Sequence, residues 1–254
     1  MLTFTILAIF LAVWLAFQKR AAYPPAIAAT TSVGYLPAVG LTTLGITSES
    51  HVSRLDRQAV SYFQALSAEE QKLYTFPLSA IGKKVSGSVK TQNVTLFRWQ
   101  RVPELALGHD HVSFLLNSQG KLAGFSRMIP AAAASPLPNE KTAEQKARGF
   151  LQIYAPDLLP VMNVQWIKPH TDEQYSDGQN QYRINGMKVK YRNRADRTYF
   201  WVIIGSDNSV IVFERDIEWD FIRAGRQTEK WLHDDWLQKY KISFIKNCPF
   251  EVLS

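Results

Sequence analysis

The residues that come closest to a metal-binding pattern are His109, Asp110 and His111. If this segment is a strand, the spacing places both imidazoles on one face. A zinc site needs at least a third protein ligand, and the neighbouring sequence offers none. The alternative is a solvated turn in front of a strand, and we therefore predict no metal site.

The positions of the other acidic and histidine residues can be explained without a reactive site. Asp216, Glu218 and Asp220 alternate, which predicts one solvated strand face, whereas carboxylates for acid–base catalysis must converge at fixed separations. A further group accompanies the start of an expected C-terminal helix, where acidic residues are favourable without any site: Glu229, His233, Asp234 and Asp235. The sequence contains no G-x-S-x-G, Walker, G-x-G-x-x-G or H-E-x-x-H motif. We predict no catalytic residue and no cofactor.

The segment MKVKYRNR, residues 187–194, alternates apolar and cationic positions. As a strand it directs Met187, Val189 and Tyr191 to one face and a cationic row to the other: Lys188, Lys190, Arg192 and Arg194. One interpretation is a charged outer face that discourages edge pairing. The alternative is contact with an anionic lipid surface, at ~1 kcal/mol per cation. Nucleic acid ranks third, because the only local aromatic residue lies on the apolar face.

The composition is that of a globular chain with a good core. The 254 residues, 46% hydrophobic and 20% charged, allow one large domain or two small ones. The net charge of +7 favours anionic partners such as phospholipid headgroups or nucleic acid, or is simply a solvated basic surface. The single cysteine, Cys248, excludes an intramolecular disulfide and has no adjacent base or helix start to lower its pKa.

The chain begins with MLTFTILAIFLAVWLAF, seventeen residues without a charge, followed by Lys19 and Arg20. This length is at the short end for a membrane-spanning helix, and the two cations can extend it by snorkelling. We predict a single-pass transmembrane anchor over residues 1–20, and the flanking charges place the following residues in the cytoplasm. The alternatives are a signal peptide cleaved near residues 26–28 and burial in a soluble core. Residues 21–50, with three Pro and three Gly, are expected to form a linker.

Two segments that lie 88 positions apart share one order of features. FLLNSQGKLAGFSR (114–127) and VIIGSDNSVIVFER (202–215) each have an apolar run, four turn-forming residues, a second apolar run and an Arg. This pattern predicts two β-hairpins. The same offset aligns two segments with helical spacing, 57–66 and 145–154, and two alternating segments, 94–102 and 182–191.

These matches predict an α+β fold made of two similar helix-plus-antiparallel-meander units. Unit 1 covers residues 51–130 and unit 2 covers residues 139–220, with Asn139 as the cap of the second helix. A strand at 164–170 is an added element of unit 2, and 171–180 is expected to be a polar turn. The alternative is that meanders with similar turns look alike by chance.

A C-terminal helix is predicted over residues 226–244. Its apolar residues follow one side of the helix: Trp231, Leu232, Trp236, Leu237 and Tyr240. The structural interpretation is that this helix packs onto the body of the protein. The functional alternative is contact with a partner or with a membrane surface.

The helix TAEQKARGFLQIY, followed by a hairpin with an NSQGK or SDNS turn, resembles PepSY-type and cystatin-like units. The resemblance covers most of residues 51–220 and rests on pattern. It implies an extracytoplasmic location, in conflict with the flanking charges, and an inhibitory, propeptide or ligand-binding role. It identifies no functional residue.

We therefore predict a non-catalytic, membrane-anchored binding or assembly protein that acts on a protein partner or a membrane component. The alternative is a hydrolase with its site between the two units. A cleft lined by polar groups from both units would favour the hydrolase, and a filled, apolar junction would favour binding. A nucleic-acid binder is the third option.

Overall fold

The computed structural model describes residues 54–82, 92–130, 136–222 and 224–246. The segments predicted as an anchor (1–20) and a linker (21–50) lie outside these residues, and so does Cys248. The described residues belong to one compact unit.

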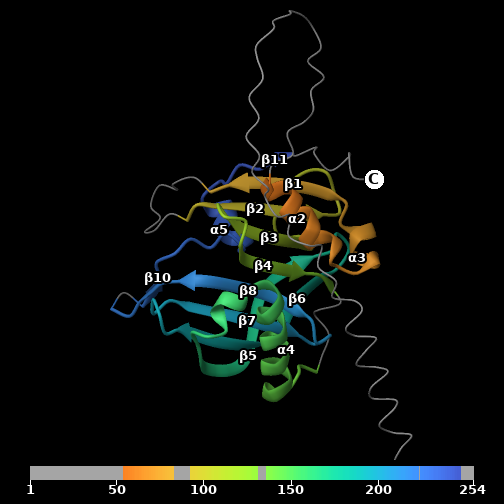
Figure 1. Ribbon diagram of the computed structural model, residues 1–254. Helices are drawn as coiled ribbons and strands as arrows, with labels where there is room; N and C mark the ends of the chain where they lie inside the picture. The colour runs from red at the N-terminus through yellow and green to blue at the C-terminus, as the bar shows by residue number, and fades with distance from the viewer. Residues whose placement is uncertain (1–53, 83–91, 131–135, 223, 247–254) are drawn as a thin grey trace, which may run out of the picture. The chain divides into compact units, whose positions relative to one another are not determined.

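Nine strands in the described part of the chain form one antiparallel sheet (Figure 1) in the order β11-β1-β2-β3-β4-β8-β7-β6-β5. Their bounds are β1 Phe76–Ile81, β2 Val94–Gln100, β3 His111–Asn117, β4 Leu122–Met128, β5 Met162–Ser176, β6 Gln181–Asn193, β7 Tyr199–Gly205, β8 Val210–Ile217 and β11 Ile245–Lys246. A separate two-stranded ribbon pairs β9 Trp219–Asp220 with β10 Gly225–Arg226. The predicted hairpins are confirmed as β3–β4 and β7–β8.

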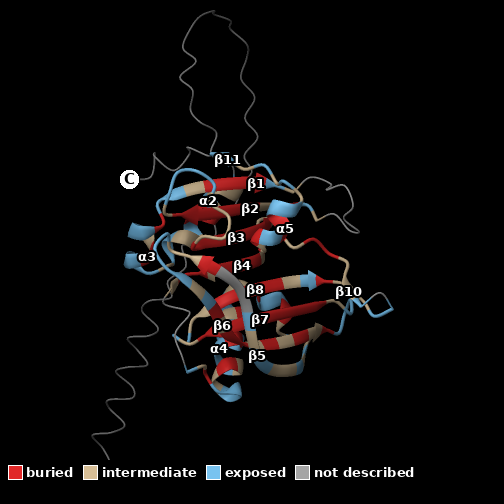
Figure 2. Ribbon diagram, turned by 180° about the vertical axis from the view of Figure 1, so that it is seen from behind, coloured by how far each residue is buried: buried red, intermediate tan, exposed pale blue. Residues whose placement is uncertain are grey.

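Helices cover both faces of this sheet. The described helices are α2 Arg54–Gln64, α3 Ala68–Leu73, α4 Glu140–Tyr154, the short 3₁₀ turn η2 Pro156–Leu158, and α5 Asp234–Lys239. Figure 1 shows α2 and α4 on the front face, and Figure 2 shows α5 on the back face. The predicted cap of α4 is confirmed, since the side chain of Asn139 accepts a hydrogen bond from the backbone of Thr142.

A hydrophobic core lies on each face of the sheet. On the front, three helix residues are fully buried: Ala59 of α2, and Ala147 and Leu151 of α4. These residues lie on the apolar side of each helix, and the small alanines let the helices approach the strands closely. On the back, Trp231 and Leu232 belong to a second cluster that covers the inner strands of the first meander. Figure 2 shows the strands as mostly buried.

The two meanders, β1–β4 and β5–β8, join along their last strands. The pairs Gly124–Glu214, Phe125–Phe213 and Ser126–Val212 connect β4 to β8. We call this junction the seam. Each of these strands would otherwise present unpaired backbone groups along an edge, and pairing satisfies them.

The seam overturns the predicted fold class. The prediction of an α+β protein with two similar helix-plus-meander units, an internal repeat, is wrong because the described residues form one continuous, sheet-rich body with few helices. None of the helices that the structure describes is long and apolar enough to cross a membrane, and the transmembrane helix predicted over residues 1–20 lies outside the described residues. Local patterns show where strands lie along the chain, whereas the partners of edge strands depend on long-range packing.

Two smaller predictions also fail. Of the helix expected over residues 226–244, only residues 234–239 are helical, as α5. The residues that precede α5 instead contact the rest of the protein through their side chains. The carboxylate of Glu229 accepts hydrogen bonds from the backbone of Gln92 and from the indole of Trp231. The strand expected at 164–170 extends as β5 to Ser176, so most of the expected turn at 171–180 is strand.

Buried ion pairs attach this C-terminal segment to the back of the sheet. Asp234 accepts from both terminal nitrogens of Arg98, at 2.7 and 3.0 Å, and from the backbone of Gly108 at 2.7 Å. The two side chains are 1% and 5% exposed. Nearby, Glu214 pairs with Arg226 at 2.6 Å and with His233 at 3.2 Å. The charges of Arg226 and His233 lower the pKa of Glu214, although burial opposes them.

Removal of one partner of such a pair leaves the other charged and buried. We expect Asp234→Ala to lower the free energy of unfolding by about 3–5 kcal/mol, as measured by urea denaturation. The matched control is Arg148→Gln, which breaks the exposed Glu144–Arg148 pair on α4 and should cost at most about 0.5 kcal/mol. Equal effects of the two substitutions would contradict the attachment of the C-terminal segment through buried ion pairs.

Candidate functional site

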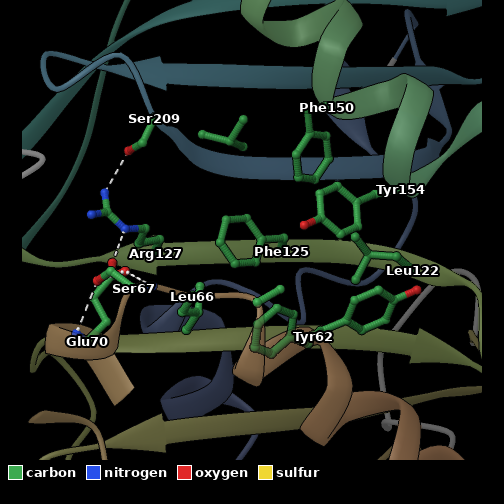
Figure 3. Close-up of a pocket in the computed structure, with 13 residues that line it drawn as sticks. Tyr62, Leu66, Ser67, Glu70, Leu122, Phe125, Arg127, Phe150, Tyr154 and Ser209 are labelled. Atoms are coloured by element: carbon green, nitrogen blue, oxygen red, sulfur yellow. Dashed lines mark hydrogen bonds and ion pairs between the residues drawn. The ribbon is translucent and has the colours of Figure 1, made fainter. Parts of the chain in front are cut away.

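A cavity of about 270 Å³ lies above the seam, between α2 and α4. We call it the seam pocket. Figure 3 shows its aromatic side chains together and its charged side chains at one end. The lining residues are Tyr62, Ala65, Leu66, Ser67, Glu70, Phe114, Leu122, Phe125, Arg127, Phe150, Tyr154, Ser209 and Val210.

Aromatic rings from both helices and from the sheet form the walls and floor of the seam pocket. Tyr62 of α2 meets Tyr154 of α4 edge-on, with ring centroids 5.9 Å apart, and stacks on Phe114 of β3 at 5.8 Å. Phe125 of β4 lies 6.2 Å from Phe150 of α4. Because Phe114 and Phe125 are nearly buried while the helix residues are half-buried, the floor belongs to the core and the rim meets solvent.

A network of ion pairs forms the polar end of the seam pocket. Arg127 donates through Nε to Glu70, and through Nη1 to Asp207 at 2.8 Å and to the Ser209 hydroxyl at 2.6 Å. Ser67 caps α3, and its hydroxyl donates to Glu70 at 2.6 Å. Helix α3, the end of β4 and the β7–β8 turn therefore meet at this point.

The carboxylates of this network are held in their charged form. Burial opposes ionisation of Glu70, but hydrogen bonds from Ser67 and Arg127 lower its pKa. Hydrogen bonds from Ser209 and Arg127 lower the pKa of Asp207 in the same way. A carboxylate with a lowered pKa is a weak base and a poor proton donor near neutral pH. No histidine occurs among the described residues that line the pocket.

The predicted cationic row lies on the opposite side of the second meander from α4. Lys188, Lys190 and Arg192 alternate with buried residues of β6, as predicted. Arg194 does not join the row, because it follows the end of the strand and donates to the backbone carbonyl of Pro160 at 3.0 Å. The side chains of Lys188, Lys190 and Arg192 are half-buried.

Aromatic side chains from three other strands surround Lys190. Its Nζ lies 4.4 Å from the ring centroid of Tyr199, 5.5 Å from Trp166 and 5.9 Å from Trp219. Lys188 lies 3.8 Å from the ring of Trp201. Burial lowers the pKa of Lys190. The sequence did not reveal these contacts, since they depend on the register of β5, β6 and β7.

The other residues considered for chemistry have separate partners. Asp110 accepts from the hydroxyl of Tyr74 at 2.8 Å and from Arg101 at 2.5 Å, whereas the buried ring of His111 bonds to the carbonyl of His109 at 2.9 Å. Across the described ranges, no three His, Cys, Asp or Glu side chains are grouped as metal ligands would be.

The acidic row expected from 216 to 220 is divided between β8 and β9. Asp216 belongs to β8 and has a positive φ of 59°, which breaks the strand alternation. It pairs with Arg215, and Asp220 accepts from the backbone of Ile222 at 2.8 Å. These carboxylates therefore do not form one strand face.

No protein-family model, curated protein or solved structure matches this chain. The resemblance to PepSY-type and cystatin-like units therefore stays a prediction.

His111 makes stability depend on pH. Burial, assisted by the charge of Arg98, lowers its pKa from 6.5 to about 4. Between these values the unfolded chain binds a proton that the folded protein does not, so the free energy of unfolding falls as the pH falls from 6.5 to about 4. We expect His111 to contribute up to ~1.4 kcal/mol per pH unit.

The contribution can be measured by urea denaturation of the wild type and of His111→Gln across this pH range. The slope of the wild type should be the steeper one. Carboxylates such as Asp234 titrate in both proteins, so the comparison removes most of their effect. Parallel curves would contradict the assignment to His111.

Proposed function

We propose that the protein is a binding protein whose seam pocket accepts an aromatic side chain of a polypeptide partner. The observation that carries this proposal is the ring of half-buried aromatic residues around an open cavity. Aromatic rings prefer edge-to-face and offset contacts, worth ~0.5–1.5 kcal/mol per pair beyond area burial. Such pockets are typical of the sites where a partner's anchor residue binds.

The size of the seam pocket favours a side chain over a larger ligand. At about 270 Å³ it lies just below the range of roughly 300–1,000 Å³ that is typical of drug-sized ligands. A single aromatic side chain can contact the floor at Phe125 and the rim at Tyr62 and Tyr154. The rest of the partner would remain outside the cavity.

The polar end supports recognition of a polypeptide backbone. Glu70 and Asp207 carry two negative charges against the single positive charge of Arg127, which leaves this end negative. Carboxylate and hydroxyl oxygens there have lone pairs that can accept from backbone N–H groups. An anchor side chain in the aromatic part and a backbone amide at the polar end would fix the partner's orientation.

The hydrolase alternative is less well supported by the same geometry. A serine nucleophile needs a base that can take its proton. The hydroxyls of Ser67 and Ser209 donate to Glu70 and Asp207, whose lowered pKa values make them weak bases. The arrangement is better suited to holding Arg127 than to activating an oxygen.

The proposal can be tested with N-acetyl-tryptophanamide as the probe, followed by NMR. We expect shifts at residues that line the seam pocket. Ala65→Trp should weaken binding at least about tenfold, because Ala65 is exposed at the rim and a large side chain there fills the cavity without disturbing the core. The matched control, Ile153→Trp on the exposed side of α4, should bind like the wild type.

Two results would contradict the proposal. One is unchanged binding by Ala65→Trp, or shifts confined to residues away from the seam pocket. The other is hydrolysis of an ester or peptide by the wild type that is lost in Ser67→Ala or Ser209→Ala, which would favour the hydrolase.

A further inference from the structure

The two-stranded β9–β10 ribbon and its loop expose large apolar side chains. Ile222 is 98% exposed, Phe221 is 72% exposed and Trp219 is 41% exposed. Figure 2 shows this ribbon extending from the edge of the body, with its tip exposed. Single exposed apolar residues are common, but a cluster at the tip of a projecting ribbon indicates an interaction site.

The tip continues into the cationic row. Phe221 contacts Tyr199 edge-on, with ring centroids 6.3 Å apart, and Tyr199 lies beside both Lys190 and Arg192. Trp219 also lies beside Lys190. We call this set the cation–aromatic surface; it consists of Trp166, Lys188, Lys190, Arg192, Tyr199, Trp201, Trp219, Phe221 and Ile222.

Two cations of this surface, Lys190 and Arg192, have no nearby counter-charge among the described residues. In that part of the chain, no carboxylate is within ion-pair distance of either side chain. Lys168 of β5 stands directly opposite Lys188 of β6, which adds two further cations to this part of the sheet.

We propose that the cation–aromatic surface docks on an anionic phospholipid bilayer. Phe221 and Ile222 would enter the boundary between headgroups and acyl chains, while Trp219 lies at headgroup level, where amphipathic rings are favoured. Lys190 and Arg192 would contact lipid phosphates. The proposal is independent of the seam pocket, which lies on the other face of the sheet.

The observations favour lipid over nucleic acid. Binding of single strands needs open ring faces on which bases stack. Beside the cationic row, Trp201 and Tyr199 are only 8% and 9% exposed, and lysines lie over both rings. The exposed rings, Phe221 and Trp219, belong to the apolar tip. The most exposed residue is the aliphatic Ile222, which suits acyl chains and offers no stacking surface.

The test places an environment-sensitive NBD fluorophore at the tip of the full-length protein. Ile222→Cys is labelled in a Cys248→Ser background, so that the fluorophore is attached at the tip alone. Adsorption of the protein through other parts of the chain then leaves the fluorescence unchanged. We expect a blue shift with vesicles that contain phosphatidylserine and none with phosphatidylcholine alone. The control label at Ile153→Cys, exposed on α4, should not shift.

A charge-matched pair of variants tests the cationic row. Lys190→Gln with Arg192→Gln should weaken vesicle binding, read from the tip label, about 25-fold, or about fivefold per cation. Lys141→Gln with Lys146→Gln removes the same charge from the exposed side of α4 and should have much less effect.

Three results would overturn the proposal. They are a tip label that does not respond to phosphatidylserine, equal losses in the two charge variants, and a response to a single-stranded oligonucleotide that exceeds the response to vesicles. The last result would assign the surface to nucleic acid.

Discussion

The backbone pairing of β4 with β8 is the constraint on which the rest of the structure depends. It unites two four-stranded meanders in one sheet and thereby sets the distance between α2 and α4, which bounds the seam pocket. On the back of the seam the C-terminal segment approaches closely. A Cβ added to Gly124 would lie 2.8 Å from Cδ1 of Leu232, so a larger residue there would force the Leu232 side chain to move. The seam is therefore covered on one face and open on the other.

The covered face relies on charges that are costly to bury. Arg98 and Glu214 project from strands on either side of the seam, and each finds its counter-charge on the C-terminal segment. Replacing such pairs by hydrophobic residues is often neutral or stabilising, so their value need not be stability. We interpret them as determinants of register, because a displaced segment would separate Arg226 from Glu214 and Asp234 from Arg98 and leave buried charges unpaired. Apolar contacts of Trp231 alone would tolerate a displaced segment.

Local features could be predicted from the sequence, and contacts between distant segments could not. The turn residues after Asn117 and Gly205 locate both hairpins, and Asn139 identifies the start of α4, because these signals act within a few residues. The continuous sheet, and hence the correct fold class, depends on which edges pair. The apolar faces of α2 and α4 were apparent, but not the cavity between them. The rings around Lys190 come from strands whose register the sequence does not specify.

The seam pocket shares its floor with the hydrophobic core, so a substitution in the floor changes the free energy of unfolding as well as the shape of the pocket. Phe114 and Phe125 are 4% and 5% exposed and pack in the front core, so truncating them would create a cavity as well as remove a contact. The rim residues Tyr62 and Tyr154 are only half-buried, although they pack against the edge of that core. A guest side chain would thus meet a buried floor and a partly exposed rim. Differences in specificity should therefore arise at the rim, where the free energy of unfolding limits substitution least.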